Sequence, residues 1–234
     1  MNSPRGSGFV AAGIILLTLI AFGRSPAMSE STTTSIELPA PRTAEGLSVE
    51  TALSTRRSVR QFADTALSTE ELGQLVWAAQ GITRTGGYRT APSAGALYPL
   101  EIFMAIGPEG DIPAGVYRYD PARHALTKTA DGDRRAELSE AALSQGSVRG
   151  APAVMVICAV FQRVTRKYGD RGMQYTFQES GHAAQNVHLQ AVSLGLGSVP
   201  VGAFRGDPVR RVLGAGENEV PVYIIPIGHP AGTE

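Results

Sequence analysis

The sequence predicts an α+β fold, because helical and extended patterns are mixed along the chain without strict alternation. An unbroken apolar run over residues 153–161 is typical of a strand buried at the centre of a sheet. A long helical pattern without proline covers residues 173–194 and ends at glycines. Three extended segments separated by turns come before both, over 101–107, 115–120 and 125–129.

Length and charge narrow the class of protein. The chain has 234 residues, with 21 basic and 21 acidic side chains. This length suits one domain with a sizeable core, or at most two small domains. The balanced charge argues against a nucleic-acid partner, which requires a basic face. Cys158 is the only cysteine and lies in the apolar run, which predicts a buried, inert thiol, with a reactive thiol as the alternative.

The N-terminus carries the features of an export signal. Arg5 precedes an apolar run over residues 9–22, which is short for a membrane span. Small residues at Ser25 and Ala27 then fit a signal-peptidase site. We therefore expect a signal peptide over residues 1–27 and export to the periplasm or the medium. The alternative is an uncleaved membrane anchor through residues 9–22.

The folded domain is expected over residues 47–234. Residues 28–46 are rich in Ser, Thr and Pro without a periodic apolar pattern, which predicts a flexible tether. Ser48 is a candidate helix cap, followed by an apolar stripe of Val49, Ala52 and Leu53. This first helix is expected to end at the arginine-rich segment 56–60.

A second helix begins with a recognisable cap. Ser68 and Glu71 have the spacing of a capping box, apolar residues follow at helical spacing, and Gly81 ends the pattern. Further patterns predict short helices over 134–143 and 208–213, and extended segments over 198–204 and 220–227.

Two short segments carry candidate binding chemistry. Arg56, Arg57 and Arg60, together with Ser58, place three guanidinium groups and a hydroxyl within five residues. Such a cluster can hold a phosphate through forked, charge-assisted hydrogen bonds. Residues 91–99 are mostly small, so their backbone can approach a planar ligand closely. Together the two segments indicate a phosphorylated aromatic cofactor.

Polar residues near the long helix have two interpretations each. Lys167 and Tyr168 can donate protons and stabilise negative charge, or they belong to an ordinary surface loop. Glu179 and His182 form either a satisfied polar network or a contact with cofactor or substrate. His188 is six residues from His182, so the two rings point to different sides of a helix, and no metal site is predicted.

The glycines at 195 and 197 do not form a dinucleotide-binding motif. They follow a predicted helix and precede a strand, which reverses the required order, and the third glycine position is Pro200. We expect a helix stop followed by a tight turn.

Five segments, in order between residues 47 and 230, resemble the nitroreductase family and specifically its SagB-type branch, the thiazoline/oxazoline dehydrogenases. The segments are Arg56-Arg57-Ser58-Val59-Arg60-Gln61-Phe62, Pro92-Ser93-Ala94-Gly95-Ala96-Leu97-Tyr98-Pro99, Lys167-Tyr168-Gly169-Asp170-Arg171, Glu179-x-Gly181-His182-x-x-Gln185-Asn186 and Gly195-Leu196-Gly197-Ser198-x-Pro200-x-Gly202-x-Phe204.

The resemblance implies a nitroreductase-like α+β fold with a mainly antiparallel sheet, a homodimer, and FMN at the subunit interface. By position, it assigns the FMN phosphate and ribityl chain to Arg56, Arg57, Ser58 and Arg60. It assigns the flavin or its tail to Ser93, Ala94 and Gly95. The isoalloxazine ring is assigned to Pro200, Val201, Gly202 and Ala203, with a backbone amide near N5. Lys167 and Tyr168 match a pair that assists proton removal in branch members that dehydrogenate azolines.

The expected function is that of an FMN-dependent oxidoreductase, which passes hydride through flavin N5 between a donor and a small organic substrate. NAD(P)H is a candidate donor. The alternatives are a flavin-binding protein without turnover and a relative of the fold that has lost flavin.

Overall fold

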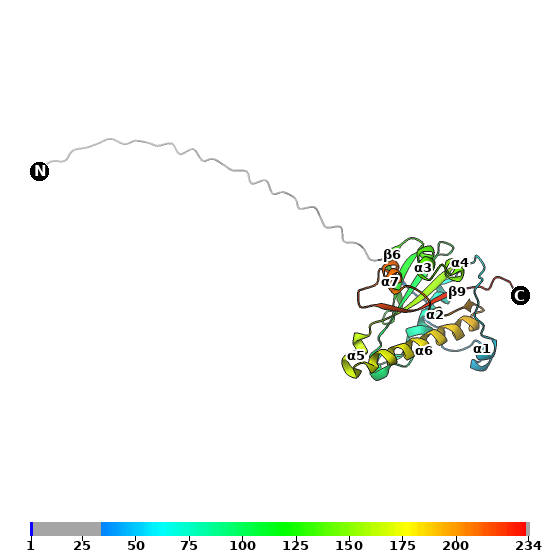
Figure 1. Cartoon of the computed structure of the whole chain (residues 1–234), viewed down its shortest axis with the longest axis horizontal. Helices are drawn as coiled ribbons and strands as arrows, with labels where there is room; N and C mark the ends of the chain where they lie inside the picture. The colour runs from blue at the N-terminus through cyan, green and yellow to red at the C-terminus, as the bar shows by residue number, and fades with distance from the viewer. Residues whose placement is uncertain (2–33, 233–234) are drawn as a thin grey trace. The chain divides into compact units, whose positions relative to one another are not determined.

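Seven strands form one sheet at the centre of the structure (Figure 1). The structure is a computed structural model that describes Met1 and residues 34–232. The sheet order is β1-β6-β5-β4-β7-β9-β8, and each neighbouring pair is antiparallel. The strands are β1 (Ser35–Glu37), β4 (Leu100–Ile106), β5 (Gly115–Asp120), β6 (Ala125–Asp131), β7 (Ala153–Ala159), β8 (Gly197–Ser198) and β9 (Val220–Gly228). The predicted α+β class with a mainly antiparallel sheet is confirmed.

Seven helices accompany the sheet in the described residues. They are α1 (Val49–Thr55), α2 (Thr69–Gln80), α3 (Arg135–Ala141), α4 (Gly146–Gly150), α5 (Gln162–Tyr168), α6 (Arg171–Ser193) and α7 (Gly206–Leu213), with a 3-10 turn η1 (Ala94–Ala96). A hairpin pairs β2 (Ile82–Arg84) with β3 (Tyr88–Arg89). The capping box of Ser68 and Glu71 is present at the start of α2, as predicted. None of the helices described is long and apolar enough to span a bilayer.

The core lies on both faces of the sheet. Alternate residues of β7 face opposite sides: Met155 and Ile157 join one apolar cluster, and Val154 and Val156 join the other. Helices α2 and α6 supply the first cluster, and α3, α4 and α7 supply the second. Burial on both faces explains why this strand is apolar without interruption. Cys158 belongs to it, and burial raises the pKa of its thiol.

The long helix α6 connects the regions that carry the candidate site residues. Figure 1 shows α5 near the beginning of α6 and α1 near its end. Its 23 residues correspond to a length of about 35 Å at ~1.5 Å per residue. Groups that contact α6 at different heights are therefore well separated.

The predicted tether over 28–46 is wrong for its described part, residues 34–46. Strand β1 pairs with β6 at the edge of the sheet, and Leu38 is buried. The backbone N–H and C=O of Arg42 both bond to the side chain of Gln74. The domain thus begins before Leu47. A three-residue edge strand is too short to produce a periodic pattern, so the pairing of β1 with β6 could not be predicted from residues 35–37. Apart from Met1, the predicted signal peptide over 1–27, including the alternative anchor at 9–22, lies outside the described residues.

The first helix has the predicted cap but not the predicted buried stripe. Ser48 caps α1 by accepting from the Thr51 N–H. Of the three apolar residues only Ala52 is buried, and the exposed fractions of Val49 and Leu53 are 63% and 53%. The helix therefore presents apolar side chains outward.

Candidate functional site

The arginine-rich segment lies against β8. Arg56 caps the C-terminal end of α1, and Ser58 forms an isolated parallel bridge with Ser198. The N–H of Val59 donates to the Ser198 carbonyl at 3.1 Å. Gly197 permits this approach, because a Cβ there would lie 2.6 Å from the Val59 Cβ. The structure thus brings the arginines beside the strand that leads directly into residues 200–203.

The three guanidinium groups of this segment are held by uncharged partners. Arg56 Nη1 lies 2.8 Å from His188 Nε2, and Arg57 Nη1 donates to the carbonyls of Ser54 and Arg56. Arg60 Nη1 makes a long bond of 3.4 Å to the Ser58 carbonyl. Within residues 34–232, none of the three pairs with a carboxylate. Three uncompensated positive charges within five residues fit the phosphate that the resemblance implies.

Residues 200–203 supply free backbone donors next to this segment. Val201 is buried and exchanges two hydrogen bonds with Ile224 of β9, at 2.7 and 3.0 Å. Gly202 and Ala203 are exposed, and in the described chain their N–H groups have no hydrogen-bond acceptor. Space around Gly202 is open, because a Cβ there would meet no atom within 4 Å. Two N–H groups are therefore available to a ligand.

A second group of predicted residues meets at the 3-10 turn η1. Gly95 has φ +62°, and a Cβ built on it would lie 2.7 Å from Tyr168 Oη and 2.9 Å from Lys167 Nζ. The ends of both side chains therefore converge on the predicted flavin-contact loop. Lys167 and Tyr168 lie in helix α5, which the sequence patterns did not predict. Arg163 of the same helix donates to the Tyr98 carbonyl at 2.8 Å and so ties α5 to this loop.

Glu179 fixes the same loop from α6. Its Oε1 accepts from the Ala94 N–H at 2.8 Å, so that N–H is not available to a cofactor. Ser93 Oγ accepts from the Tyr98 N–H at 2.9 Å. Burial raises the pKa of Glu179, and the bond from Ala94 opposes that shift. His182 is exposed on the rim of a hollow that Ser93, Ala94 and Glu179 also line.

The two groups of residues contact α6 at different heights. Arg56 bonds to His188, and Ala94 bonds to Glu179, nine residues earlier on the helix. At ~1.5 Å per residue this is about 14 Å along the axis. One chain therefore holds the arginine segment with residues 197–203, and separately the Ser93–Gly95 loop with Lys167 and Tyr168.

His188 is a site residue that the sequence prediction missed. Its ring is 3% exposed, with Nε2 toward Arg56 and Nδ1 2.6 Å from Ser198 Oγ. Burial, and next the charge of Arg56, lower its pKa. The available signal was its place on the buried stripe of α6 with Ala184 and Ala191, where a polar ring needs partners.

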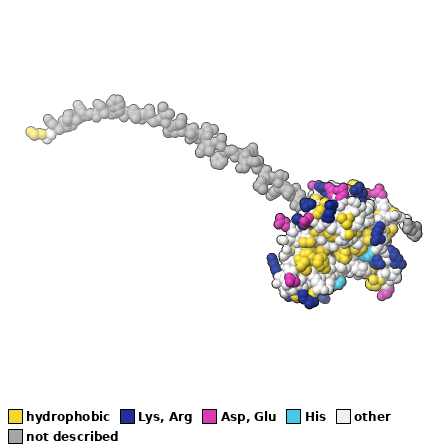
Figure 2. Space-filling view, in the orientation of Figure 1, with side chains coloured by type: hydrophobic (Ala, Val, Ile, Leu, Met, Phe, Trp, Pro, Cys, Tyr) yellow, Lys and Arg dark blue, Asp and Glu magenta, His cyan; other side chains and the backbone are white. Residues whose placement is uncertain are grey.

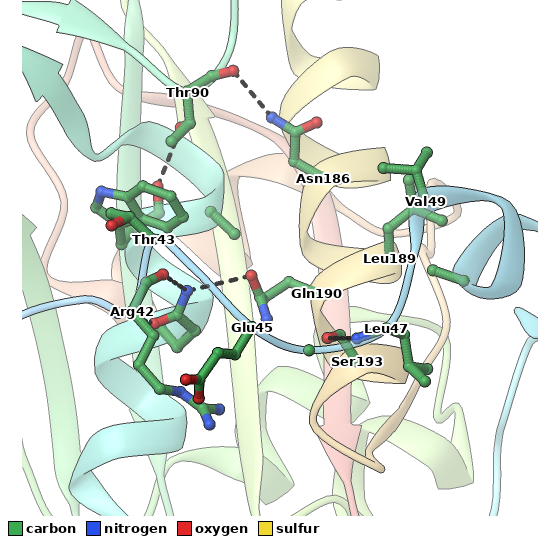
Figure 3. Close-up of a pocket in the computed structure, with 15 residues that line it drawn as sticks. Arg42, Thr43, Glu45, Leu47, Val49, Thr90, Asn186, Leu189, Gln190 and Ser193 are labelled. Atoms are coloured by element: carbon green, nitrogen blue, oxygen red, sulfur yellow. Dashed lines mark hydrogen bonds between the residues drawn. The ribbon is translucent and has the colours of Figure 1, made fainter.

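A groove of about 330 Å³ lies apart from both groups, between residues 42–49, α2 and α6 (Figure 3). Its polar side chains bond within the protein: Asn186 Nδ2 donates to the Thr90 carbonyl, and Gln74 Nε2 donates to Gln190 Oε1. None of the predicted site residues lines it. The groove is therefore not the predicted cofactor site.

Comparison with curated proteins gives one relative matched over nearly its full length and two longer relatives matched in part. The chain is 44% identical over 184 residues to "Putative nitroreductase MJ1384" of Methanocaldococcus jannaschii, which covers 79% of this chain and 92% of that protein. It is 26% identical to the "FMN reductase [NAD(P)H]" of Bacillus subtilis, over 77% of this chain and 65% of the relative. It is 27% identical to the "Microcin B17-processing protein McbC" of Escherichia coli, over 58% and 52%. The chain thus spans only about half to two thirds of the length of these last two.

A solved structure and a family model agree with these relatives. The crystal structure of a "putative nitroreductase" from Ralstonia eutropha matches with a TM-score of 0.75 and 30% identity, over 85% of this chain and 90% of that one. The family model described as "Nitroreductase family" matches residues 53–229, which include every predicted site residue from Arg56 to Ala203. On this evidence, which covers most of the described domain, the chain belongs to the nitroreductase family.

Proposed function

We propose that this protein is an oxidoreductase that uses FMN. The observation that carries the proposal is the arginine segment, whose three guanidinium groups have no carboxylate partner among residues 34–232 and lie beside the N–H groups of Gly202 and Ala203, which are free within the same residues. The guanidinium groups suit the phosphate of a flavin mononucleotide, and the backbone N–H groups suit its flat ring. The relative named FMN reductase supports the same cofactor.

Each group has a defined part in this proposal. Arg56, Arg57, Ser58 and Arg60 hold the phosphate and the ribityl chain. The backbone of residues 200–203 approaches the ring, with an N–H directed toward N5. When bound, FMN supplies hydride exchange at N5, and the protein supplies its orientation and electrostatic environment.

Lys167 and Tyr168 are proposed to act on protons next to the reacting atoms. Their convergence on Gly95 supports this role, because an ammonium and a phenol directed at one backbone position can share one ligand. The ammonium also stabilises negative charge that develops near it. The substrate is then a small molecule that reaches the loop of Ser93, Ala94 and Gly95.

Within the family, we place the protein in the SagB-type branch. The support is the set of five ordered segments and the likeness to McbC. In this branch the reaction is an azoline dehydrogenation, whereas the FMN reductase relative supports NAD(P)H as an electron donor. Measured turnover with each substrate class separates the two.

We also propose a homodimer with FMN at the interface. Large apolar side chains are exposed on α1 and α6, which is unusual for a face in contact with water alone. These residues are Val49 and Leu53 on α1 and Met173 and Phe177 on α6, and Leu47 just before α1 is exposed as well. Figure 2 shows hydrophobic side chains gathered near the middle of one face, with Lys and Arg mostly toward its margin. The elution volume of the full chain in size exclusion with light scattering tests this proposal.

Export with cleavage after Ala27 is part of the same proposal. It is supported by the apolar run and the small residues that follow it. Mass spectrometry of the protein recovered from the cell envelope and the medium should give Met28 as the first residue. A chain that retains residues 9–22 in the membrane fraction would favour the anchor instead.

The deciding experiment is the flavin content of the purified protein. We expect a yellow protein that releases FMN on denaturation and oxidises NAD(P)H with a nitroaromatic or quinone acceptor, or oxidises an azoline with oxygen. A protein that stays colourless after incubation with excess FMN overturns the proposal. A yellow protein that turns over none of these substrates supports the alternative of a flavin-binding protein without turnover.

A further inference from the structure

A chain of three side chains, two of them buried, joins β8, α6 and the end of α1. Ser198 Oγ lies 2.6 Å from His188 Nδ1, and His188 Nε2 lies 2.8 Å from Arg56 Nη1. Ser198 and His188 are 1% and 3% exposed. The predicted roles of the site residues do not use this chain, yet it ends on one of the three guanidinium groups assigned to the phosphate.

The chemistry of Arg56 fixes the state of the histidine. A guanidinium has only donors and stays charged in proteins, so Nε2 of His188 must be an unprotonated acceptor. The neutral ring then carries its proton on Nδ1 and donates it to Ser198 Oγ. The hydroxyl of Ser198 accepts this proton and so satisfies the tautomer that Arg56 requires.

Ser198 also holds the neighbouring backbone. Its carbonyl accepts from the Val59 N–H at 3.1 Å, while its side chain binds His188. The arginine segment is thus fixed at two points by one residue, directly at Val59 and through the histidine at Arg56. A long, flexible arginine side chain loses much of its conformational freedom before a ligand arrives.

We propose that His188 is a positioning residue that holds the Arg56 guanidinium ready for the phosphate of FMN, and that Ser198 supports it by accepting the Nδ1 proton of the tautomer that Arg56 requires. This inference rests on the proposed function, since it assumes that Arg56 binds phosphate. It predicts that His188 contributes to the recognition of the phosphate and not of the flavin ring. Riboflavin, which has the ring and lacks the phosphate, is the matched ligand.

The first test titrates the full-length protein, freed of flavin, with FMN and with riboflavin, by flavin fluorescence. His188→Met, which removes the acceptor for Arg56, should weaken FMN binding about tenfold and leave riboflavin binding within about twofold. His188→Gln, which offers an amide oxygen to Arg56, should restore most of the FMN affinity. His124→Gln is the control for general destabilisation, because His124 is a partly buried histidine that, like His188, has two hydrogen bonds, in its case to Tyr119 and Pro39.

A double-mutant cycle tests whether His188 acts through Arg56. In an Arg56→Ala background, His188→Met should change FMN affinity by less than about twofold, because the group that it positions is gone. An equal loss in both backgrounds overturns the proposal, as does an equal loss for FMN and riboflavin. Unchanged FMN binding by His188→Met overturns it while leaving the proposed function intact. A wild-type protein that fails to bind FMN overturns both.

One measurement needs no variant and so does not depend on how the variants fold. In wild-type protein labelled with ¹⁵N in histidine, the His188 signal at pH 7 should be that of a neutral ring protonated at Nδ1. A neutral ring protonated at Nε2, or an imidazolium, overturns the assignment.

Discussion

Arg135 and Arg56 are both arginines at a helix end, but the protein satisfies them in opposite ways. Arg135 bonds to Asp133 and Glu109 and donates to the Ala151 carbonyl at 3.0 Å. Its hydrogen bonds to Asp133 raise its pKa despite burial. In the described part of the chain, the side-chain partner of Arg56 is a neutral histidine and not a carboxylate. The fold thus neutralises the charge of Arg135 with two carboxylates, whereas the charge of Arg56 is left available to a bound anion.

The difference extends to the regions around the two residues. Glu101 of β4 forms salt bridges with both Arg118 of β5 and Arg163 of α5. In the same way, Arg135 forms salt bridges with two carboxylates. The segment 56–60 contains three arginines and no acid. The chain has equal numbers of basic and acidic residues, but the charge of segment 56–60 is therefore strongly positive. Paired arginines serve stability, and the unpaired cluster is suited to an anion.

The largest expected effect is the loss of stability on removal of Arg135, the arginine that is paired with carboxylates. Arg135→Ala leaves Asp133 and Glu109 without their partner at a site where the arginine side chain is only 11% exposed. We expect a loss of about 3 kcal/mol or more in the free energy of unfolding, with little change in FMN affinity of the folded protein. Urea unfolding measures the first quantity and flavin titration the second. A stability loss below ~1 kcal/mol would contradict the distinction.

Removal of two unpaired arginines should give the reverse result. Arg57→Ala combined with Arg60→Ala removes two charged donors whose partners, among the residues described, are backbone carbonyls. FMN affinity should fall about 100-fold, while the free energy of unfolding changes by less than ~1 kcal/mol. Retained FMN content in this double variant would show that the cluster is not the phosphate site.

The features that the sequence analysis predicted correctly have local signals, whereas the buried pairing of Arg135 was not predicted. The capping box of Ser68, the apolar run of β7 and the arginine cluster each consist of adjacent residues whose chemistry is visible without tertiary structure. The resemblance gave Lys167 a role in proton removal, but the position of Lys167 next to Gly95 was not predicted. Its contact depends on α5, a helix of seven residues that has one buried side chain and so no apolar stripe.

The features that the sequence analysis missed depend on contacts across the chain. Strand β1 forms only because β6 offers a free edge, and residues 35–37 have no pattern of their own. His188 meets Arg56 across 132 positions of sequence, and its role needs both that contact and Ser198. Hydrogen-bond partners of a buried polar residue cannot be deduced from its own segment.

Lys167, in the second group of site residues, has no carboxylate partner in the part of the chain that the structure describes. Lys167→Ala should leave FMN content unchanged and lower turnover about 30-fold, because a proton donor and a positive charge near the reacting atoms are lost. Stopped-flow reduction and absorbance spectra of the same sample separate the two quantities. Loss of flavin together with activity would assign Lys167 to cofactor binding instead.

Gly197 tests whether the arginine segment needs its close contact with β8. A methyl group in Gly197→Ala would lie 2.6 Å from the Val59 Cβ, so the segment must move away. We expect a loss of about 1–2 kcal/mol in stability and several-fold weaker FMN binding. Gly181→Ala is the matched control, since a Cβ there meets no atom within 4 Å and a helix favours alanine. Equal effects of the two substitutions would remove the close contact from the explanation.

The smallest expected effect is a pH dependence of stability that distinguishes the two kinds of arginine partner. His188 has a lowered pKa, from burial and then from Arg56, against about 6.5 in the unfolded chain. As pH falls below about 6.5, the unfolded state therefore takes up a proton that the folded state resists, and the free energy of unfolding declines until pH passes the folded pKa. His188→Gln should lack this part of the decline, whereas His124, whose pKa burial also lowers, contributes equally to both proteins. Unfolding of flavin-free wild type and His188→Gln between pH 7.5 and 4.5 (about three pH units around the unfolded value) tests this. The charged group in contact with the His188 ring is Arg56, so Arg56→Ala should weaken the decline as well. If the free energy of unfolding depends on pH in the same way in all three proteins, the histidine does not titrate against Arg56.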